Sequence, residues 1–361
     1  MWTDVVGQER AITALERAAE RPAHAYLLVG PRGSGVEQAA RGFAARLIDV
    51  DDQRSQRLVE RGMHPDVVEF EPGAASYSVK TDVRERILPE AHRSPIEAEH
   101  KVLLLFEAEK LRGNQNESAN AMLKTLEEPP DRTILVLVTS VAEDLLPTIR
   151  SRCQRIDFDP VADDTLAAAL AAEGVDSAQA ALAAGLSGGQ LARARAIAGP
   201  LANLRALFAA APGRMDGTGA TALAIAEQLD ASVSGAADQV AARHAAEVAE
   251  FDAEMERYGY SDRDAQRMRR RLDERHKREA RRARSDLLIE GVTAIESVYR
   301  DVLAAPAPGL NTDLQLPVVS ARGAAEALDA CAEAREAFTI NEKGIVRLTA
   351  LLLSLPPAVS R

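Results

Sequence analysis

Cysteine and aromatic residues are scarce in this chain of 361 residues. It contains two cysteines, Cys153 and Cys331, and only 4% of its residues are aromatic. Two cysteines supply neither a four-ligand metal framework nor a convincing disulfide pattern. We therefore expect no metal site. Alanine is abundant instead, which favours helices.

Long hydrophobic runs are also missing. No stretch approaches the roughly 20 apolar residues that a membrane helix needs. The first residues, Met1 to Asp4, have neither the basic nor the apolar region of a secretory signal. With 46% hydrophobic and 27% charged residues, the composition is that of a soluble globular protein. We expect a cytoplasmic protein of two or three domains, without a membrane partner.

Positive charge is in deficit overall, but it is clustered. The net charge of −11 argues against a free-standing, nonspecific DNA binder. One run at residues 263–284 is nevertheless rich in basic residues, among them Arg267, Arg269, Arg270, Arg271, Arg275, Lys277, Arg278, Arg281, Arg282 and Arg284. The run could contact DNA phosphates. Alternatively it forms one face of a charged helical hairpin, balanced by the acidic residues Glu247, Glu250, Asp252, Glu254 and Glu256.

The first 160 residues alternate apolar, strand-like runs with helical patterns. The clearest strand candidates are residues 25–29, 66–70, 102–106 and 134–138, and the helix candidates are 36–48, 82–92 and 116–128. Continuous apolar strands separated by helices predict an α/β domain, with a parallel sheet covered on both faces. Ligands of such folds bind beyond the carboxyl ends of the strands.

The rest of the chain reads as helical. Residues 161–200 are rich in alanine and glycine and suggest a small helical lid, and residues 201–361 suggest a separate all-α domain. Within that domain, a charged stretch at about 236–300 is interrupted near Tyr258–Asp262. Gly259 can end one helix, and Ser261 or Asp262 can cap the next. This pattern predicts an antiparallel helical hairpin.

A glycine-rich segment follows the first strand. Gly30, Gly33 and Gly35 lie in the sequence Gly-Pro-Arg-Gly-Ser-Gly-Val-Glu, which matches the glycines of the phosphate-binding pattern G-x-x-x-x-G-K-[ST]. Val36 stands where the lysine would contact the phosphates, and Glu37 stands where a hydroxyl would hold magnesium. Any glycine-rich turn could give such a match by itself. If it is a phosphate loop, we expect no ATP hydrolysis there.

The end of the third strand also lacks a residue that ATP hydrolysis needs. An active P-loop ATPase ends this strand with an aspartate that helps hold magnesium, and Phe106 occupies that place here. Glu107 keeps the place of the water-activating glutamate. The alternative is that Glu107 and Glu109 are solvated residues at the start of a helix.

Three further segments resemble the clamp-loader subunits of bacterial DNA polymerase III, a family of AAA+ proteins. Residues 119–130 resemble the family signature A-x-A-L-L-K-T-L-E-E-P-P, and residues 145–154 resemble L-L-P-T-I-x-S-R-C-Q. Val5-Val6-Gly7-Gln8 resembles the V-G-Q box beside the adenine pocket, and Thr139-Ser140 lies at the sensor 1 position. The order and spacing of these segments also agree with the family.

The resemblance implies a function without hydrolysis. Broken Walker motifs beside an intact S-R-C segment are typical of the family's delta-prime subunits. Arg152, flanked by Ser151 and Cys153, would then be an arginine finger that acts in trans on Mg-ATP bound by a neighbouring subunit. The alternative for Arg152 is a structural salt bridge. The chain would need no cofactor of its own.

The other site residues follow from the same resemblance. Gly30, Gly33 and Gly35 would be a degenerate P-loop, and Val6, Gly7 and Gln8 would be the remnant of an adenine pocket. Arg193 is the candidate for sensor 2. The family's four-cysteine zinc module has no counterpart here, because residues 49–64 contain no cysteine.

The resemblance also implies partners. These are the gamma/tau and delta subunits in a hetero-pentamer rather than a homo-oligomer, joined through a collar at residues 201–361. The complex would act on the sliding clamp and primed DNA. Two alternatives are an active gamma/tau-type ATPase and an unrelated P-loop enzyme such as a nucleotide kinase.

Overall fold

A computed structural model describes residue 2 and residues 5–48, 53–72, 76–112, 116–258, 262–307, 309–340 and 344–358. The chain divides into two compact units. The first comprises residues 1–174 and 187–194, and the second comprises residues 175–186 and 195–361. Residues 259–261, where the hairpin turn was expected, lie outside the described residues, as do residues 49–52.

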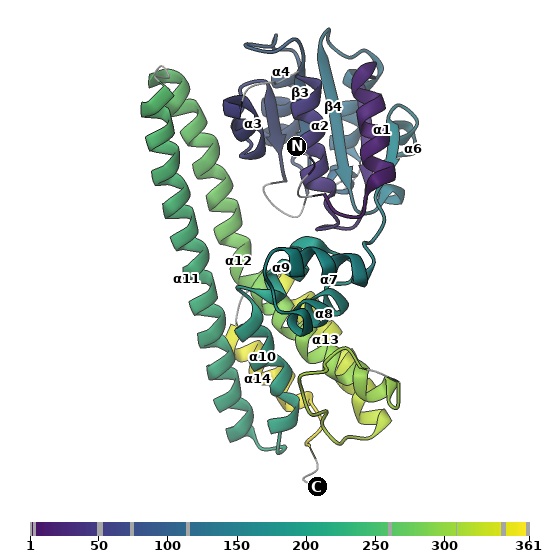
Figure 1. Cartoon of the computed structure of the whole chain (residues 1–361), viewed down its shortest axis with the longest axis vertical. Coiled ribbons are helices and arrows are strands. Elements are labelled where there is room, and N and C mark those ends of the chain that lie inside the picture. Colours follow the sequence, from purple (N-terminus) through teal and green to yellow (C-terminus); the bar gives the residue numbers. More distant parts are fainter. Residues whose placement is uncertain are drawn as a thin grey trace. The chain divides into compact units, whose positions relative to one another are not determined.

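The first unit is built on a parallel five-stranded sheet, which confirms the predicted α/β class. The strands are β1 (Ala25–Val29), β2 (Val67–Phe70), β3 (Lys101–Leu105), β4 (Thr133–Thr139) and β5 (Gln154–Asp157). Their order across the sheet is β2-β3-β4-β1-β5, and every pairing is parallel. The carboxyl ends of β1, β3 and β4 therefore meet at one edge of the sheet (Figure 1).

Helices cover both faces of this sheet. Alternate side chains of each strand point to opposite faces, and they contribute to two separate apolar clusters. Leu28, Leu104 and Val136 belong to one apolar cluster. Leu27 and Leu103 belong to the other. The first cluster includes residues of α1 (Glu9–Glu20) and α2 (Val36–Leu47). The second includes residues of the helical segment Val79–Ile87, of α5 (Glu117–Glu127) and of α6 (Pro147–Arg150).

Shorter elements complete the first unit. They are α3 (Gln53–Glu60), α4 (Leu88–Ala91), the single turns Ala108–Arg112 and Ala142–Asp144, and α7 (Asp163–Ala172). The segment expected to form a lid contributes to both units. Helix α7 and the start of α9 (Leu191–Ala198) belong to the first, and α8 (Ser177–Ser187) lies almost entirely in the second.

The second unit is helical, which agrees with the all-α region predicted for residues 201–361. It contains α10 (Ala202–Ala210), the turn Pro212–Arg214, α11 (Gly219–Tyr258), α12 (Asp262–Ala304), α13 (Ala321–Ile340) and α14 (Gly344–Ser354). One apolar cluster joins α10 to α14, with Phe208, Leu288 and Tyr299 fully buried in it. Among the described residues, no helix combines the length and apolar character needed to cross a membrane.

Helices α11 and α12 form a long antiparallel hairpin (Figure 1). The hairpin is longer than the predicted stretch 236–300, because 40 residues of α11 and 43 of α12 are helical. Described basic residues of the run face acids of α11. Arg269 pairs with Asp252, Arg275 with Glu247, and Arg284 with Asp230. This arrangement favours the charge-balanced hairpin over DNA contact for those residues.

Candidate functional site

The glycine-rich segment forms a tight strand-to-helix turn at the carboxyl edge of the sheet. The Gly30 amide donates to the Thr139 carbonyl at 3.0 Å, which ties the loop to the end of β4. A Cβ atom on Gly30 would lie 2.6 Å from Cβ of Phe158, so no larger residue fits. Gly35 has a φ of 93° and is the N-cap residue of α2. The loop therefore directs the N-terminus of α2 toward the space where phosphate groups bind in P-loop proteins.

Gln8 stabilises this loop through hydrogen bonds to its backbone and to the chain after β5. Its side chain is 5% exposed, and its amide nitrogen donates to the backbone carbonyls of Ser34 at 3.2 Å and of Asp159 at 2.6 Å. Gly7 has a φ of 69°, and a Cβ there would lie 2.8 Å from Val161. These contacts give Gly7 and Gln8 a structural task. Among the described residues, Val6, Gly7 and Gln8 do not line the cavity that adjoins the loop.

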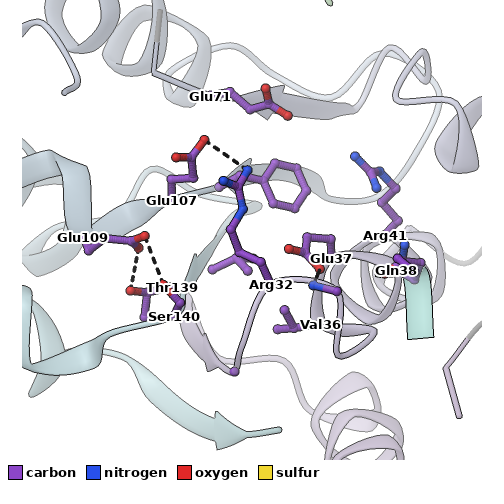
Figure 2. A pocket seen from close by; sticks show the side chains of 15 residues that line it. Arg32, Val36, Glu37, Gln38, Arg41, Glu71, Glu107, Glu109, Thr139 and Ser140 are labelled. Carbon is purple, nitrogen blue, oxygen red and sulfur yellow. Dashed lines mark hydrogen bonds and ion pairs between the residues drawn. The ribbon is translucent and has the colours of Figure 1, made fainter. Parts of the chain in front are cut away.

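That cavity has a volume of about 310 Å³ (Figure 2). It lies among the glycine-rich loop, the first turns of α2 and the ends of β3 and β4. Its lining residues are Gly30, Arg32, Gly33, Val36, Glu37, Gln38, Arg41, Glu71, Phe106, Glu107, Glu109, Val138, Thr139, Ser140 and Ala192. The structure thus brings together the glycine-rich loop, the end of β3 and the pair Thr139-Ser140.

The carboxylate of Glu37 turns back onto the loop. Its Oε2 accepts a hydrogen bond from the Gly33 amide at 3.4 Å. In an active P-loop, such amides bind phosphate oxygens. The preceding residue, Val36, is 1% exposed and belongs to the sheet's apolar cluster. A protein carboxylate therefore occupies part of the anion cradle, and no cation projects from position 36.

Both arginines that line the cavity are already paired with carboxylates. Arg32 lies 3.6 Å from Glu107 (Figure 2), and Arg41 makes two hydrogen bonds to Glu69, at 2.7 and 2.8 Å. Burial by itself lowers the pKa of Arg41, but the Glu69 carboxylate outweighs it and raises this pKa above its usual value. The Arg41 guanidinium also lies 5.0 Å from the Phe106 ring centroid. The described lining therefore offers an incoming triphosphate no uncommitted arginine.

The end of β3 is held rigidly. Phe106 is 4% exposed, and its carbonyl lies 2.6 Å from the Tyr77 hydroxyl. Glu107 follows with a left-handed φ of 50°, and its carboxylate also contacts Lys110. Next to it, Glu109 accepts hydrogen bonds from the hydroxyls of Thr139 at 2.7 Å and Ser140 at 3.3 Å. The Thr139 and Ser140 hydroxyls thus bind a carboxylate of the chain itself.

The charges of the cavity add up to an acidic site. Four carboxylates line it, from Glu37, Glu71, Glu107 and Glu109, against the two paired arginines. Like charges in a partly enclosed site repel strongly. A nucleotide triphosphate with its magnesium ion would have to overcome this repulsion without help from a lysine, a P-loop hydroxyl or a Walker B aspartate.

Arg152 lies at the other end of the strands, near the amino ends of β1 and β5. It precedes β5, and Gln154, the first residue of β5, pairs in register with Tyr26 near the start of β1. The glycine-rich loop begins after the end of β1. Because the two strands are parallel and each residue advances about 3.3 Å, the length of β5 separates Arg152 from the glycine-rich loop. Arg152 is therefore not placed to act on its own cavity.

Arg152 is one-third exposed and held at two points. Its Nη1 donates to the Thr148 carbonyl at 2.8 Å, and its Nη2 donates to Oε1 of Glu127 at 2.6 Å. Ser151 is exposed and donates to the same carbonyl at 3.2 Å. Cys153 packs against the sheet's second apolar cluster, and burial raises the pKa of its thiol to about 12. Cys153 is thus a packing residue with an unreactive thiol.

Comparison with known proteins finds relatives of residues 7–162. Residues 7–162 match the family model described as DNA polymerase III, delta subunit. Over 167 residues the chain is 35% identical to DNA polymerase III subunit tau of Bacillus subtilis, covering 44% of this chain and 29% of that protein. Over 158 residues it is 33% identical to subunit delta' of Pseudomonas aeruginosa, covering 42% of this chain and 47% of that protein.

Residues 7–162 are thus similar to subunits of the DNA polymerase III clamp loader. The match spans less than half the length of either curated relative, and it includes tau and delta' subunits alike. The whole chain also aligns with a DNA polymerase III gamma-subunit-related protein of Thermotoga maritima, with a TM-score of 0.46 and 16% identity over 95% of this chain and 97% of that one. That likeness is too distant to add to the family assignment.

Within residues 7–162, several contacts were not foreseen from the sequence. They are the Arg41–Glu69 pair, the place of Glu71 and the pairing of Arg152 with Glu127. Arg41 follows Glu37 by one helical turn, a spacing that puts both residues on one face of α2, but its partner lies 28 residues away on β2. Arg193 does not line the described cavity, whereas its neighbour Ala192 does.

Proposed function

We propose that this chain is the non-hydrolysing, delta-prime-type subunit of a clamp loader. In this role it lends Arg152 to ATP bound by an adjacent gamma/tau subunit and hydrolyses none itself. The observation that carries the proposal is the acidic, self-occupied phosphate loop, in which Glu37 binds the Gly33 amide. A site of this kind opposes the binding of Mg-ATP rather than promoting it.

The place of Arg152 supports the second half of the proposal. It lies at the sheet edge away from its own cavity, is partly exposed, and keeps N–H donors for an acceptor on another molecule. A guanidinium against a γ-phosphate neutralises the charge that develops during phosphoryl transfer. Arginine fingers accelerate such reactions by about 10³- to 10⁵-fold, which corresponds to about 4–7 kcal/mol of barrier.

The wider role follows from the family. The chain would join delta and gamma/tau subunits in a cytoplasmic hetero-pentamer that opens the sliding clamp and closes it around primed DNA. The helical second unit, with its large apolar cluster, would form the collar through which the subunits assemble. The chain would bind no cofactor of its own.

Turnover by the purified chain separates this proposal from an active gamma/tau-type ATPase. We expect no ATP hydrolysis above a buffer blank, with or without primed DNA, while a purified gamma/tau subunit hydrolyses ATP in the same assay. The chain should also co-elute with the delta and gamma/tau subunits in gel filtration, and the complex should load a clamp onto primed DNA. Turnover at the rate of the gamma/tau control would contradict the proposal.

A further inference from the structure

The Arg152 guanidinium is held by a residue from a different element. Glu127 is the last residue of α5, 25 residues earlier in the chain. Its Oε1 accepts from Nη2 of Arg152 at 2.6 Å, and the Thr148 carbonyl accepts from Nη1 at 2.8 Å. One acceptor precedes β4 in the chain and the other follows it, so two separate points of the fold fix the plane of the guanidinium.

Helix α5 is a firm base for this contact. Its residues Ala119, Met122 and Leu126 are buried in the apolar cluster on one face of the sheet, and Ser118 donates to the Tyr77 carbonyl at 2.8 Å. The helix ends at Glu127, and the C-terminal end of a helix dipole adds to the local negative potential that attracts a cation. The backbone position of Glu127 is therefore set by the core, and from there its carboxylate reaches Arg152.

The pair leaves most of the arginine available. A guanidinium has five N–H donors, and the contacts to Glu127 and Thr148 use one on each terminal nitrogen. Nε–H and one N–H on each terminal nitrogen remain for an acceptor on another molecule. The contacts thus orient the Arg152 guanidinium and leave three of its N–H donors available.

Stability does not account for the pair. The Arg152 and Glu127 side chains are 33% and 49% exposed, and ion pairs at such exposed positions contribute little to folding because water screens them and ordering both side chains costs entropy. Holding a flexible arginine in one orientation instead reduces the entropy lost when it meets its target.

We propose that Glu127 is a positioning residue for Arg152, holding the guanidinium ready for the γ-phosphate of the neighbour's ATP. The inference rests on the function proposed above. Its mechanism requires that Glu127 act only through Arg152, so the two residues must behave as one unit in the reaction.

The test is a double-mutant cycle in the reconstituted clamp loader, with DNA-stimulated ATP turnover as the readout. We expect Glu127→Ala to lower kcat about tenfold at the affected site and to leave the KM for ATP unchanged, because the finger acts in the transition state. The neighbouring exposed glutamate provides the matched control, and Glu128→Ala should behave as wild type. In an Arg152→Ala background, Glu127→Ala should have no further effect.

Assembly by gel filtration and the thermal midpoint of the free chain normalise each variant for folding. Wild-type kcat for Glu127→Ala, alongside a reduced kcat for Arg152→Ala, would overturn the positioning role and leave the arginine finger standing. An equal loss from Glu127→Ala in both backgrounds would also overturn it. Wild-type turnover for Arg152→Ala would instead refute the proposed function itself.

Discussion

Glu37 and Val36 stand together at the start of α2, where an active P-loop carries a hydroxyl residue and a lysine. The Glu37 carboxylate binds the Gly33 amide, while Val36 is buried against the sheet. The backbone of the loop keeps the strand–loop–helix geometry of a phosphate-binding site. The difference from an active P-loop is the charge at this point, where a carboxylate replaces a lysine and a hydroxyl.

Repairing these two positions should restore binding without restoring catalysis. We expect the double variant Val36→Lys with Glu37→Thr to bind ATP at least about tenfold more tightly than wild type, a gain of about 1.4 kcal/mol. The reason is that a lysine replaces an apolar side chain and the Gly33 amide is released. Hydrolysis should stay absent, because Phe106 still occupies the place of the Walker B aspartate. Isothermal titration calorimetry with Mg-ATP measures the gain.

A matched variant isolates the effect of the carboxylate. Val36→Lys alone keeps Glu37 on the Gly33 amide and should bind ATP more weakly than the double variant. If wild type bound Mg-ATP as tightly as the double variant, the electrostatic explanation of the degenerate loop would be wrong.

At the scale of elements, the α11–α12 hairpin contains two histidine–glutamate pairs that cross between its helices. His244 and His276 stack with ring centroids 4.1 Å apart. His244 contacts Glu279 at 2.7 Å, and His276 contacts Glu247 at 2.8 Å. Each helix thus supplies a histidine, with a glutamate one turn later, to the seam between them. The side chains of both histidines are only 10% exposed, so the cluster forms part of the hairpin's packing.

Glu247 makes the stability of this hairpin depend on pH. Burial by itself raises its pKa, but the hydrogen bond from His276 and the charge of Arg275 outweigh burial and hold the pKa below its usual value. A depressed carboxylate pKa stabilises the fold above the unfolded value, about 4.3, and this stabilisation is lost as pH falls through the folded pKa. We expect Glu247→Gln to lower the free energy of unfolding by about 1–2 kcal/mol at pH 7.

Urea unfolding followed by circular dichroism at several pH values checks this. The difference between wild type and Glu247→Gln should begin to shrink below about pH 4, where the carboxyl of the unfolded chain becomes protonated. It should vanish once the pH falls below the depressed pKa of the folded state. Glu256→Gln, an exposed change on the same helix, should differ little from wild type at every pH. A difference for Glu247→Gln that stayed constant down to pH 3 would show that its carboxylate charge is not responsible.

The elements also show what the sequence could and could not predict. Strands β1, β3 and β4 were predictable because helices cover both of their faces, so their residues are almost all apolar. Strand β5 was missed. It is an edge strand in which only Ile156 is buried, and its other residues are charged or polar. The pairings of Arg41 with Glu69 and of Arg152 with Glu127 join residues 28 and 25 positions apart, and no local pattern specifies such contacts.

At the scale of the whole molecule, the parallel sheet separates two sites that an active subunit would use in two different reactions. The acidic cavity lies at the carboxyl edge of the strands, and Arg152 lies at the amino edge. A neighbour could therefore meet Arg152 without involving the cavity. In the proposed complex, the first site is idle and the second is functional.

The most direct test compares these two edges in one assay, the DNA-stimulated ATP turnover of the reconstituted complex. One complex carries Glu37→Ala in this chain, and the other carries Arg152→Ala. We predict turnover within about twofold of wild type for Glu37→Ala, and for Arg152→Ala a loss of about 10³-fold or more at the site that the arginine faces. Reduced turnover for Glu37→Ala together with normal turnover for Arg152→Ala would contradict the account.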